Sequence, residues 1–117
     1  MTNTTTTRCL RVGNREIALD PEGYLINLSD WTPVVAEALA SEEGRVLTQE
    51  HWEVIDVLRD FYARFEMAPA MRPLVKAVGQ ALGAEKGKSL HLMKLFPESP
   101  AKVGARLAGL PKPTNCL

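Results

Sequence analysis

Polar and apolar residues alternate on both sides of Gly13-Asn14, which predicts a small β-hairpin. The apolar positions are Leu10, Val12, Ile17 and Leu19. A Gly-Asn pair readily supplies the positive φ of a tight two-residue turn. Residues 20–23, Asp-Pro-Glu-Gly, form a second turn signal, after which residues 24–26 are expected to return beside the hairpin. We therefore expect a β-hairpin region over residues 9–26.

From residue 31 onward, apolar residues recur every three or four positions, which is typical of helices. Capping residues and prolines mark five helix starts. These starts are Thr32-Pro33, Thr48, the stretch from Pro69 to Pro73, Ser89 and Ser99-Pro100. Gly83 and Gly109 are predicted helix ends, because glycine adopts the left-handed conformation that often follows a helix. The sequence predicts a mainly α protein, a compact bundle of about five helices over residues 31–109.

The apolar faces of these helices predict which side chains form the core. The second helix has the largest face and is expected to lie at the centre. Its predicted core positions are Trp52, Ile55, Leu58, Phe61, Tyr62 and Phe65. The first helix is expected to bury Val34, Val35, Ala38 and Leu39, and the fifth Val103 and Leu107. We interpret the three aromatic residues Trp52, Phe61 and Phe65 as core side chains rather than as a platform for stacking bases.

Both ends of the chain are expected to lie outside this core. Residues 110–117 contain Pro111 and Pro113, which cannot continue a helix and favour an extended backbone. We predict a mobile C-terminal arm over residues 110–117, with a reach of roughly 20 Å in polyproline geometry. Residues 1–8 are predicted to be disordered. The 117 residues suit a single domain over residues 1–117.

Charge is unevenly distributed although the formal net charge is zero. Residues 1–75 contain seven Lys/Arg and twelve Asp/Glu, whereas residues 76–117 contain seven and two. The basic C-terminal third is suited to an acidic protein partner. The zero net charge removes the general attraction to nucleic acid, so direct nucleic-acid binding is not expected. No apolar run is long enough to cross a membrane, and residues 1–7 lack the features of a signal peptide, so we expect a soluble cytoplasmic protein.

Cys116 is the residue best placed for chemistry, because a cysteine near the end of an extended arm is accessible. A thiolate is the reactive form, and nearby cations raise its population. Lys112, Arg106 and Lys102 are the nearby cations in sequence, whereas the terminal carboxylate of Leu117 opposes ionisation. A bystander thiol on a disordered tail is the alternative interpretation.

Other chemistry has little support in the sequence. Cys9 is assigned no role. His51 and His91 have no carboxylate or cysteine at metal-ligand spacing, so neither a metal nor another cofactor is expected. An alternative from a different class is a helix-turn-helix regulator made by the second and third helices, with Arg72, Lys76 and Gln80 as the residues that would contact DNA.

Several segments resemble the TusE/DsrC family of sulfur-relay proteins over nearly the whole chain. They are Asp20-Pro21-Glu22-Gly23-Tyr24-Leu25, His51-Trp52-Glu53-Val54-Ile55, Leu58-Arg59-Asp60-Phe61-Tyr62, and Pro69-Ala70-Met71-Arg72-Pro73-Leu74-Val75-Lys76. The C-terminal block is the most specific, with Leu95-Phe96-Pro97, Pro100-Ala101-Lys102 and the run from Ala108 to Leu117.

The resemblance implies a sulfurtransferase that accepts a persulfide on Cys116. It implies protein partners, a TusBCD-like sulfur donor complex and a tRNA 2-thiouridylase acceptor. From the basic C-terminal surface and the arm, we expect the partner-binding residues to be Lys102, Arg106, Pro111, Lys112 and Pro113. DsrC-type members have a second cysteine eleven positions before the last one, where this chain has Ala105. The pattern therefore resembles TusE, and a DsrC-like carrier in dissimilatory sulfur metabolism is the alternative.

Overall fold

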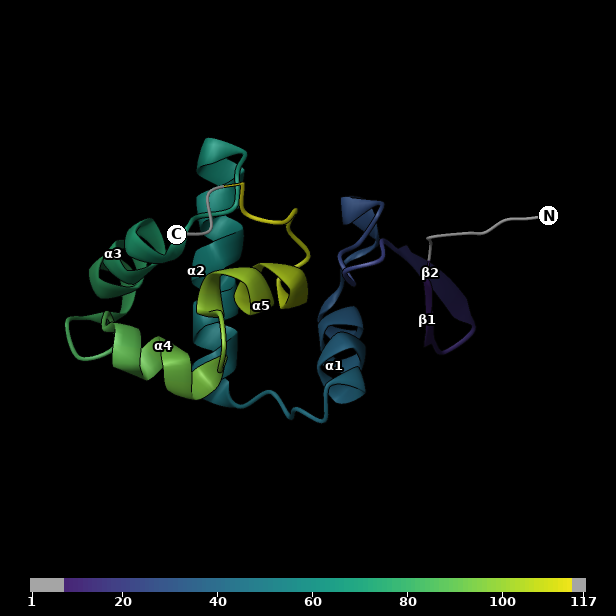
Figure 1. Ribbon diagram of the computed structural model, residues 1–117, viewed down its shortest axis with the longest axis horizontal. Coiled ribbons are helices and arrows are strands. Elements are labelled where there is room, and N and C mark those ends of the chain that lie inside the picture. The colour runs from purple at the N-terminus through teal and green to yellow at the C-terminus, as the bar shows by residue number, and fades with distance from the viewer. Residues whose placement is uncertain (1–7, 115–117) are drawn as a thin grey trace.

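An antiparallel hairpin begins the structure, a computed structural model that describes residues 8–114 (Figure 1). Strand β1 spans Arg8–Val12 and β2 spans Arg15–Leu19. Leu10 is paired with Ile17, and both side chains are buried. Gly13 has φ 60° at the turn. The chain then returns beside β2 through a Leu19–Leu25 bridge, which confirms the predicted hairpin region.

Five α-helices follow in this part of the chain, as predicted. They are α1 Pro33–Glu42, α2 Gln49–Phe65, α3 Met71–Leu82, α4 Ser89–Leu95 and α5 Pro100–Leu107. The caps act as expected at α1 and α5, where the hydroxyls of Thr32 and Ser99 accept hydrogen bonds from the amides of Val35 and Lys102. A short 3₁₀ helix at Leu28–Asp30 was not predicted.

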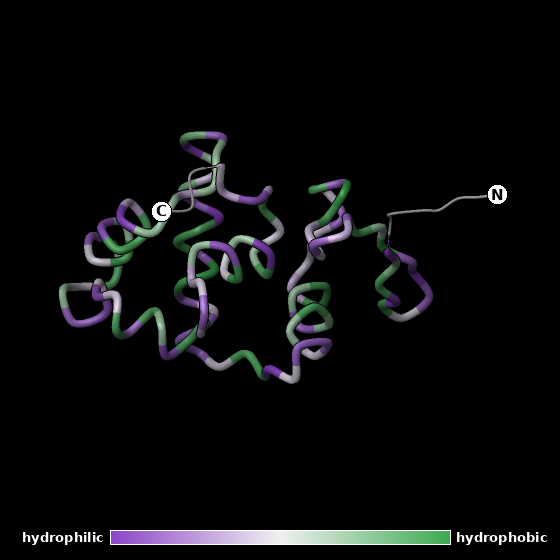
Figure 2. Tube along the Cα trace, in the orientation of Figure 1, coloured by the Kyte–Doolittle hydropathy of each residue, from purple (hydrophilic) through white to green (hydrophobic). Residues whose placement is uncertain are grey.

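Helix α2 is the central element, with α3 along one side and α5 across its middle, and α1 and the hairpin lie beyond α5 (Figure 1). Val54, Ile55 and Leu58 of α2 are fully buried. From α5, Leu107 and Ala105 are buried as well. Apolar residues recur along each helix at turn spacing, with polar residues between them (Figure 2). One hydrophobic core therefore includes residues from the hairpin and from all five helices.

His51 links the start of α2 to the end of α4. Its Nδ1 accepts a hydrogen bond from the amide of Thr48 at 3.0 Å, and its Nε2 lies 2.9 Å from the carbonyl oxygen of Leu95. Because Nδ1 is the acceptor, the proton is on Nε2, which donates to that carbonyl. His51 is thus a buried structural residue in the first turn of α2.

Some of the predicted core positions are exposed or only partly buried. Phe65 is 55% exposed, and Phe61 and Trp52 are only partly buried. The chain turns away after α2 at Glu66, with φ 55°, so the apolar stripe of α2 extends past the part that neighbouring helices cover. Val34 is 57% exposed, because α1 buries Val35, Ala36, Leu39 and Ala40 instead. Within residues 8–114, no helix has the length and apolar character needed to cross a membrane.

Candidate functional site

The root of the C-terminal arm, residues 108–113, is held against the body by contacts with Trp31. Gly109 has φ 75°, as predicted for the end of α5. A Cβ atom at Gly109 would lie 2.3 Å from Cδ1 of Trp31, so only glycine fits there. The indole Nε1–H of Trp31 donates a hydrogen bond of 2.8 Å to the carbonyl oxygen of Leu107. The last turn of α5 is therefore fixed by a residue more than 70 positions earlier in the chain.

Arg59 of α2 contacts both the Trp31 ring and the end of α5. Its guanidinium lies 3.9 Å from the centre of the Trp31 ring. It also donates a hydrogen bond of 2.7 Å to the carbonyl oxygen of Ala108. Partial burial lowers the pKa of Arg59, and nearby Asp56 acts in the opposite direction. Arg59 and Trp31 together form a clamp, named here the arm clamp, on the carbonyl groups that end α5.

The described part of the arm lies on the body. Leu110 is 2% exposed and belongs to the core, and its amide donates a hydrogen bond of 2.9 Å to the carbonyl oxygen of Ala105. Pro113 is buried as well. The predicted arm began at residue 110, whereas residues 110–113 pack against the protein in this structure. The body therefore holds the chain at least as far as Pro113.

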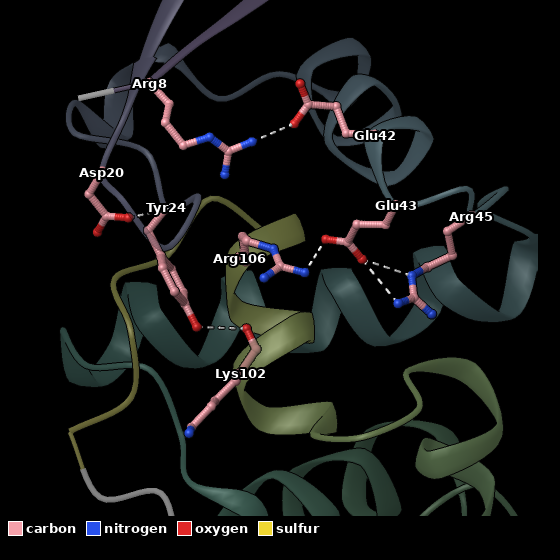
Figure 3. Close-up of polar contacts among 8 residues, drawn as sticks. All are labelled: Arg8, Asp20, Tyr24, Glu42, Glu43, Arg45, Lys102 and Arg106. Atoms are coloured by element: carbon pink, nitrogen blue, oxygen red, sulfur yellow. Dashed lines mark hydrogen bonds and ion pairs between the residues drawn. The ribbon is translucent and has the colours of Figure 1, made fainter. Parts of the chain in front are cut away.

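The turn at residues 20–24 supports α5 from the hairpin side (Figure 3). One carboxylate oxygen of Asp20 accepts hydrogen bonds of 2.9 Å from the amides of Glu22 and Tyr24. The hydroxyl of Tyr24 donates a hydrogen bond of 3.1 Å to the carbonyl oxygen of Lys102. Gly23 has φ 92° and lies against the Arg106 side chain. A Cβ atom at Gly23 would lie 3.1 Å from Cδ of Arg106. The Asp-Pro-Glu-Gly-Tyr motif therefore forms a turn against which α5 packs, named here the α5 seat.

The predicted partner-binding cations are brought together around this seat, but two of them already pair within the chain. Arg106 forms an ion pair with Glu43, which also pairs with Arg45 (Figure 3). Lys112 pairs with Glu22 at 2.8 Å. A partner that uses Arg106 or Lys112 must therefore compete with these exposed or half-buried carboxylates. Their role in partner binding remains a prediction, as do those of Lys102, Pro111 and Pro113.

Cys116 lies outside the described residues. Cys9 is exposed on β1 opposite Ala18. The side chain of Ala105, at the position of the second cysteine in DsrC-type members, is fully buried in the core. Sequence reasoning did not identify Trp31 and Arg59 as the arm clamp. Gly109 marks the end of α5 in the sequence, but no sequence signal shows that Trp31 packs against it.

The fold and the site define a small helical protein that holds the root of a cysteine-containing C-terminal tail against its body. The chain belongs to the DsrC-like protein family, whose model matches residues 11–117. Two solved structures share the fold. One is DsrC of Allochromatium vinosum, with TM-score 0.87 and 50% identity, covering 95% of this chain and 99% of that one. The other is the oxidised γ-subunit of dissimilatory sulfite reductase (DsrC) from Archaeoglobus fulgidus, with TM-score 0.80 and 38% identity, covering 94% and 100%.

Curated relatives indicate the activity within this family. Sulfurtransferase TusE of Sodalis glossinidius is 50% identical over 87% of this chain and 94% of its own. A sulfurtransferase TusE homologue of Haemophilus influenzae is 48% identical over 92% and 99%. Identity at this level over nearly complete chains extends the activity to this protein, which is a sulfurtransferase of the relay type.

Proposed function

We propose that this sulfurtransferase carries sulfur as a persulfide on Cys116 and delivers it for the 2-thiolation of wobble uridine in tRNA, in the cytoplasm. The observation that carries the proposal is the position of Cys116, three residues after the buried Pro113. The relatives named TusE support a relay in which the protein is loaded and unloaded by other proteins. The proposed partners are a TusBCD-like donor complex and a tRNA 2-thiouridylase.

The proposed chemistry is thiol-persulfide exchange. The Cys116 thiolate attacks the terminal sulfur of a donor persulfide, forms a new sulfur–sulfur bond and releases the donor cysteine as a thiolate. Cys116 then holds one additional sulfur in the sulfane oxidation state, so no external oxidant or reductant is needed. Attack by an acceptor thiolate on that outer sulfur repeats the exchange and regenerates the Cys116 thiolate. Both steps conserve atoms and electrons.

The partners are expected to complete the activation of the thiol. An ordinary cysteine is only a few per cent thiolate at neutral pH. Lys112 is the nearest cation in sequence, but it pairs with Glu22. Docking that brings the ammonium group of Lys112, four residues away in sequence, next to the thiol would raise the thiolate fraction of Cys116.

The seated arm root shortens the predicted reach. A fully extended chain spans at most about 3.6 Å per residue, so the three steps from Pro113 limit Cys116 to about 11 Å from Pro113. This is about half of the roughly 20 Å predicted for an arm that begins at residue 110. The body of the protein must therefore dock close to each partner's active site.

The single tail cysteine favours the tRNA relay over the chemistry of DsrC-type members. Ala105 is buried and has no thiol, so the persulfide on Cys116 cannot be resolved by an internal disulfide with that position. The chain can pass sulfur onward but cannot release it in this way. A DsrC-like carrier role without that disulfide is the second candidate.

Replacing Cys116 by serine tests the proposal. The full-length protein is incubated with glutathione persulfide or a persulfidated donor, and the intact mass is measured for one added sulfur atom. Wild type and Cys9→Ser should gain that sulfur, and Cys116→Ser should not. Equal loading of the Cys116→Ser variant would show that another residue carries the sulfur.

A further inference from the structure

The chain leaves α5 through a change of direction that Trp31 and Arg59 stabilise. Their hydrogen bonds to the carbonyl oxygens of Leu107 and Ala108 lie just before Gly109, whose φ of 75° turns the backbone. A hydrogen bond to a carbonyl oxygen is directional, so these two bonds fix the orientation of the end of α5 as well as adding stability. The path of the arm root therefore starts from a defined orientation.

Apolar packing leaves space beside this turn. A hollow of about 140 Å³ is lined in part by Arg59, Tyr62 and Leu110. Side chains next to an unfilled space have fewer contacts, so they fix a neighbouring segment less firmly than a close-packed core does. The guanidinium of Arg59 contacts the Trp31 ring and a backbone carbonyl, and both of these groups are neutral. Arg59 therefore orients the arm root at a place where packing is incomplete.

The number of residues between the last held position and Cys116 determines how well the sulfur is placed. With Pro113 held, three steps lead to Cys116, whereas nine steps lead there from Leu107, where α5 ends. The effective concentration of a tethered group falls roughly as the −3/2 power of the tether length, so release of the arm root would lower it about fivefold. Sulfur exchange also needs the reacting atoms within about 3.5 Å, and a loosely placed thiol reaches that geometry less often.

We propose that Arg59 is a positioning residue for sulfur transfer, which holds the arm root so that a docked partner meets Cys116 at short range. This inference rests on the proposed function, in which Cys116 carries the sulfur. Arg59 acts through Trp31 and Ala108. Its loss should therefore slow the transfer step, without weakening the binding of the partner or changing the reactivity of the thiol toward a small molecule.

The two cysteines of the chain allow this positioning to be measured without a partner. Spin labels on Cys9, which is exposed on β1, and on Cys116 give a distance distribution by double electron–electron resonance. Arg59→Met should broaden that distribution. Arg64→Met, at an exposed position on the same helix, should leave it as in wild type. A distribution as narrow in Arg59→Met as in wild type would overturn the role of Arg59.

Two further variants separate positioning from a general loss of stability. Val78→Ala truncates a fully buried side chain of α3 and keeps every contact of the arm clamp, so it should lower stability without broadening the distribution. Arg59→Lys keeps a cation that can lie over Trp31 and donate to Ala108, so it should restore much of the wild-type distribution. Equal broadening in Val78→Ala and Arg59→Met would mean that lost stability explains the effect, and the proposal would be wrong.

Single-turnover transfer measures the consequence for function. The carrier is loaded by glutathione persulfide, and loss of its added sulfur to the purified tRNA 2-thiouridylase from the same genome is followed at several acceptor concentrations. Arg59→Met should lower the maximal rate by up to about fivefold and leave the half-saturating concentration within about twofold. Six Gly/Ser residues inserted after Thr114 give the same nine-step tether with the arm clamp intact, so this variant should show the same fall. A maximal rate in Arg59→Met equal to that of wild type would overturn the proposal.

The loading step separates this inference from the proposed function. Every variant that retains Cys116 should gain one sulfur from glutathione persulfide as wild type does, because this small donor does not depend on where the arm root lies. A wild-type chain that gains no sulfur would overturn the proposed function and this inference together. Normal loading, with distances and transfer rates unchanged in Arg59→Met, would overturn this inference alone.

Discussion

The two sides of α2 are built in opposite ways. On one side, Arg59 and Trp31 hold the end of α5 through a cation–π contact and two hydrogen bonds to backbone carbonyls. On the other side, Phe65 and Arg64 lie at an open groove between α2 and α3, and the Arg64 guanidinium is 6.0 Å from the Phe65 ring. An arginine and an aromatic residue thus hold the end of α5 on one side of α2, whereas the similar pair on the other side lies at an open groove. One helix can therefore use one face for stability and leave the opposite face open to a partner.

Gly109→Ala should produce the largest loss of stability. The new Cβ would overlap Trp31, and an L-residue at φ 75° is strained, so we expect a loss of about 4 kcal/mol in the free energy of unfolding. Urea denaturation measures it. Gly44→Ala is the control, because Gly44 has φ 71° but no atom within 4 Å of the place where a Cβ would lie, and it should lose only about 1 kcal/mol. Equal losses in the two variants would mean that the contact with Trp31 contributes nothing.

Leu110→Ala compared with Phe65→Ala contrasts the buried arm root with the open groove. Leu110 is 2% exposed, so its truncation should cost about 3 kcal/mol of unfolding free energy through lost burial and a cavity. Phe65 is 55% exposed, and its truncation should cost less than about 1 kcal/mol. Both are measured by thermal and urea unfolding. A Phe65 variant as unstable as the Leu110 variant would show that the groove end is part of the core.

Arg59→Met and Arg64→Met compare two arginines on the opposite sides of α2. Methionine keeps much of the apolar stem and removes the charge. The Arg59 variant should lose about 2 kcal/mol, because a charged hydrogen bond to Ala108 and the contact with Trp31 disappear. The Arg64 variant should lose less than about 0.5 kcal/mol, since its ion pair with Asp60 is exposed. If both variants unfold at the same urea concentration, the arm clamp does not stabilise the fold.

The Glu53–Lys86 ion pair predicts a small pH effect at the edge of the groove. The hydrogen bond from Lys86 lowers the pKa of Glu53 below its ordinary value, and the same bond raises the pKa of Lys86. The contribution of Glu53 is therefore present above the unfolded-state pKa and is lost as the pH falls through the lower folded-state pKa. Glu53→Gln should flatten the decline in unfolding free energy on the acid side, measured at a series of pH values. Glu37→Gln is the control, and an unchanged acid slope in Glu53→Gln would refute the contribution of this pair.

The elements of this fold were predictable because local signals mark them. The caps at Thr32, Thr48 and Ser99 and the glycine at residue 109 are short-range features, and the structure places helix ends at each of them. The choice of Cys116 as the nucleophile came from its place on the C-terminal arm and from the family pattern, and it stays a prediction because residue 116 lies outside the described residues. These predictions did not require knowledge of which helices meet.

The contacts between distant residues were not predictable from the pattern. Trp31 is linked to Leu107 and Arg59 to Ala108 by bonds to backbone carbonyls, which leave no trace in hydrophobic spacing. Phe65 is exposed because α3 does not cover the last turn of α2. The apolar stripe of a helix does not show which of its residues another helix will cover. The burial of Pro113 could not be predicted either. Prolines indicate an extended tail, but they do not indicate whether that tail packs against the rest of the protein.

The burial of Pro113 has a consequence for traffic through the relay. A carrier on a long tether could remain bound to one client while its cargo visits another. Pro113 is buried only three positions before Cys116, so under the proposed function each exchange would require the whole molecule to change clients. Delivery is then limited by how fast complexes form and dissociate, and an excess of either client would sequester the carrier and slow the pathway.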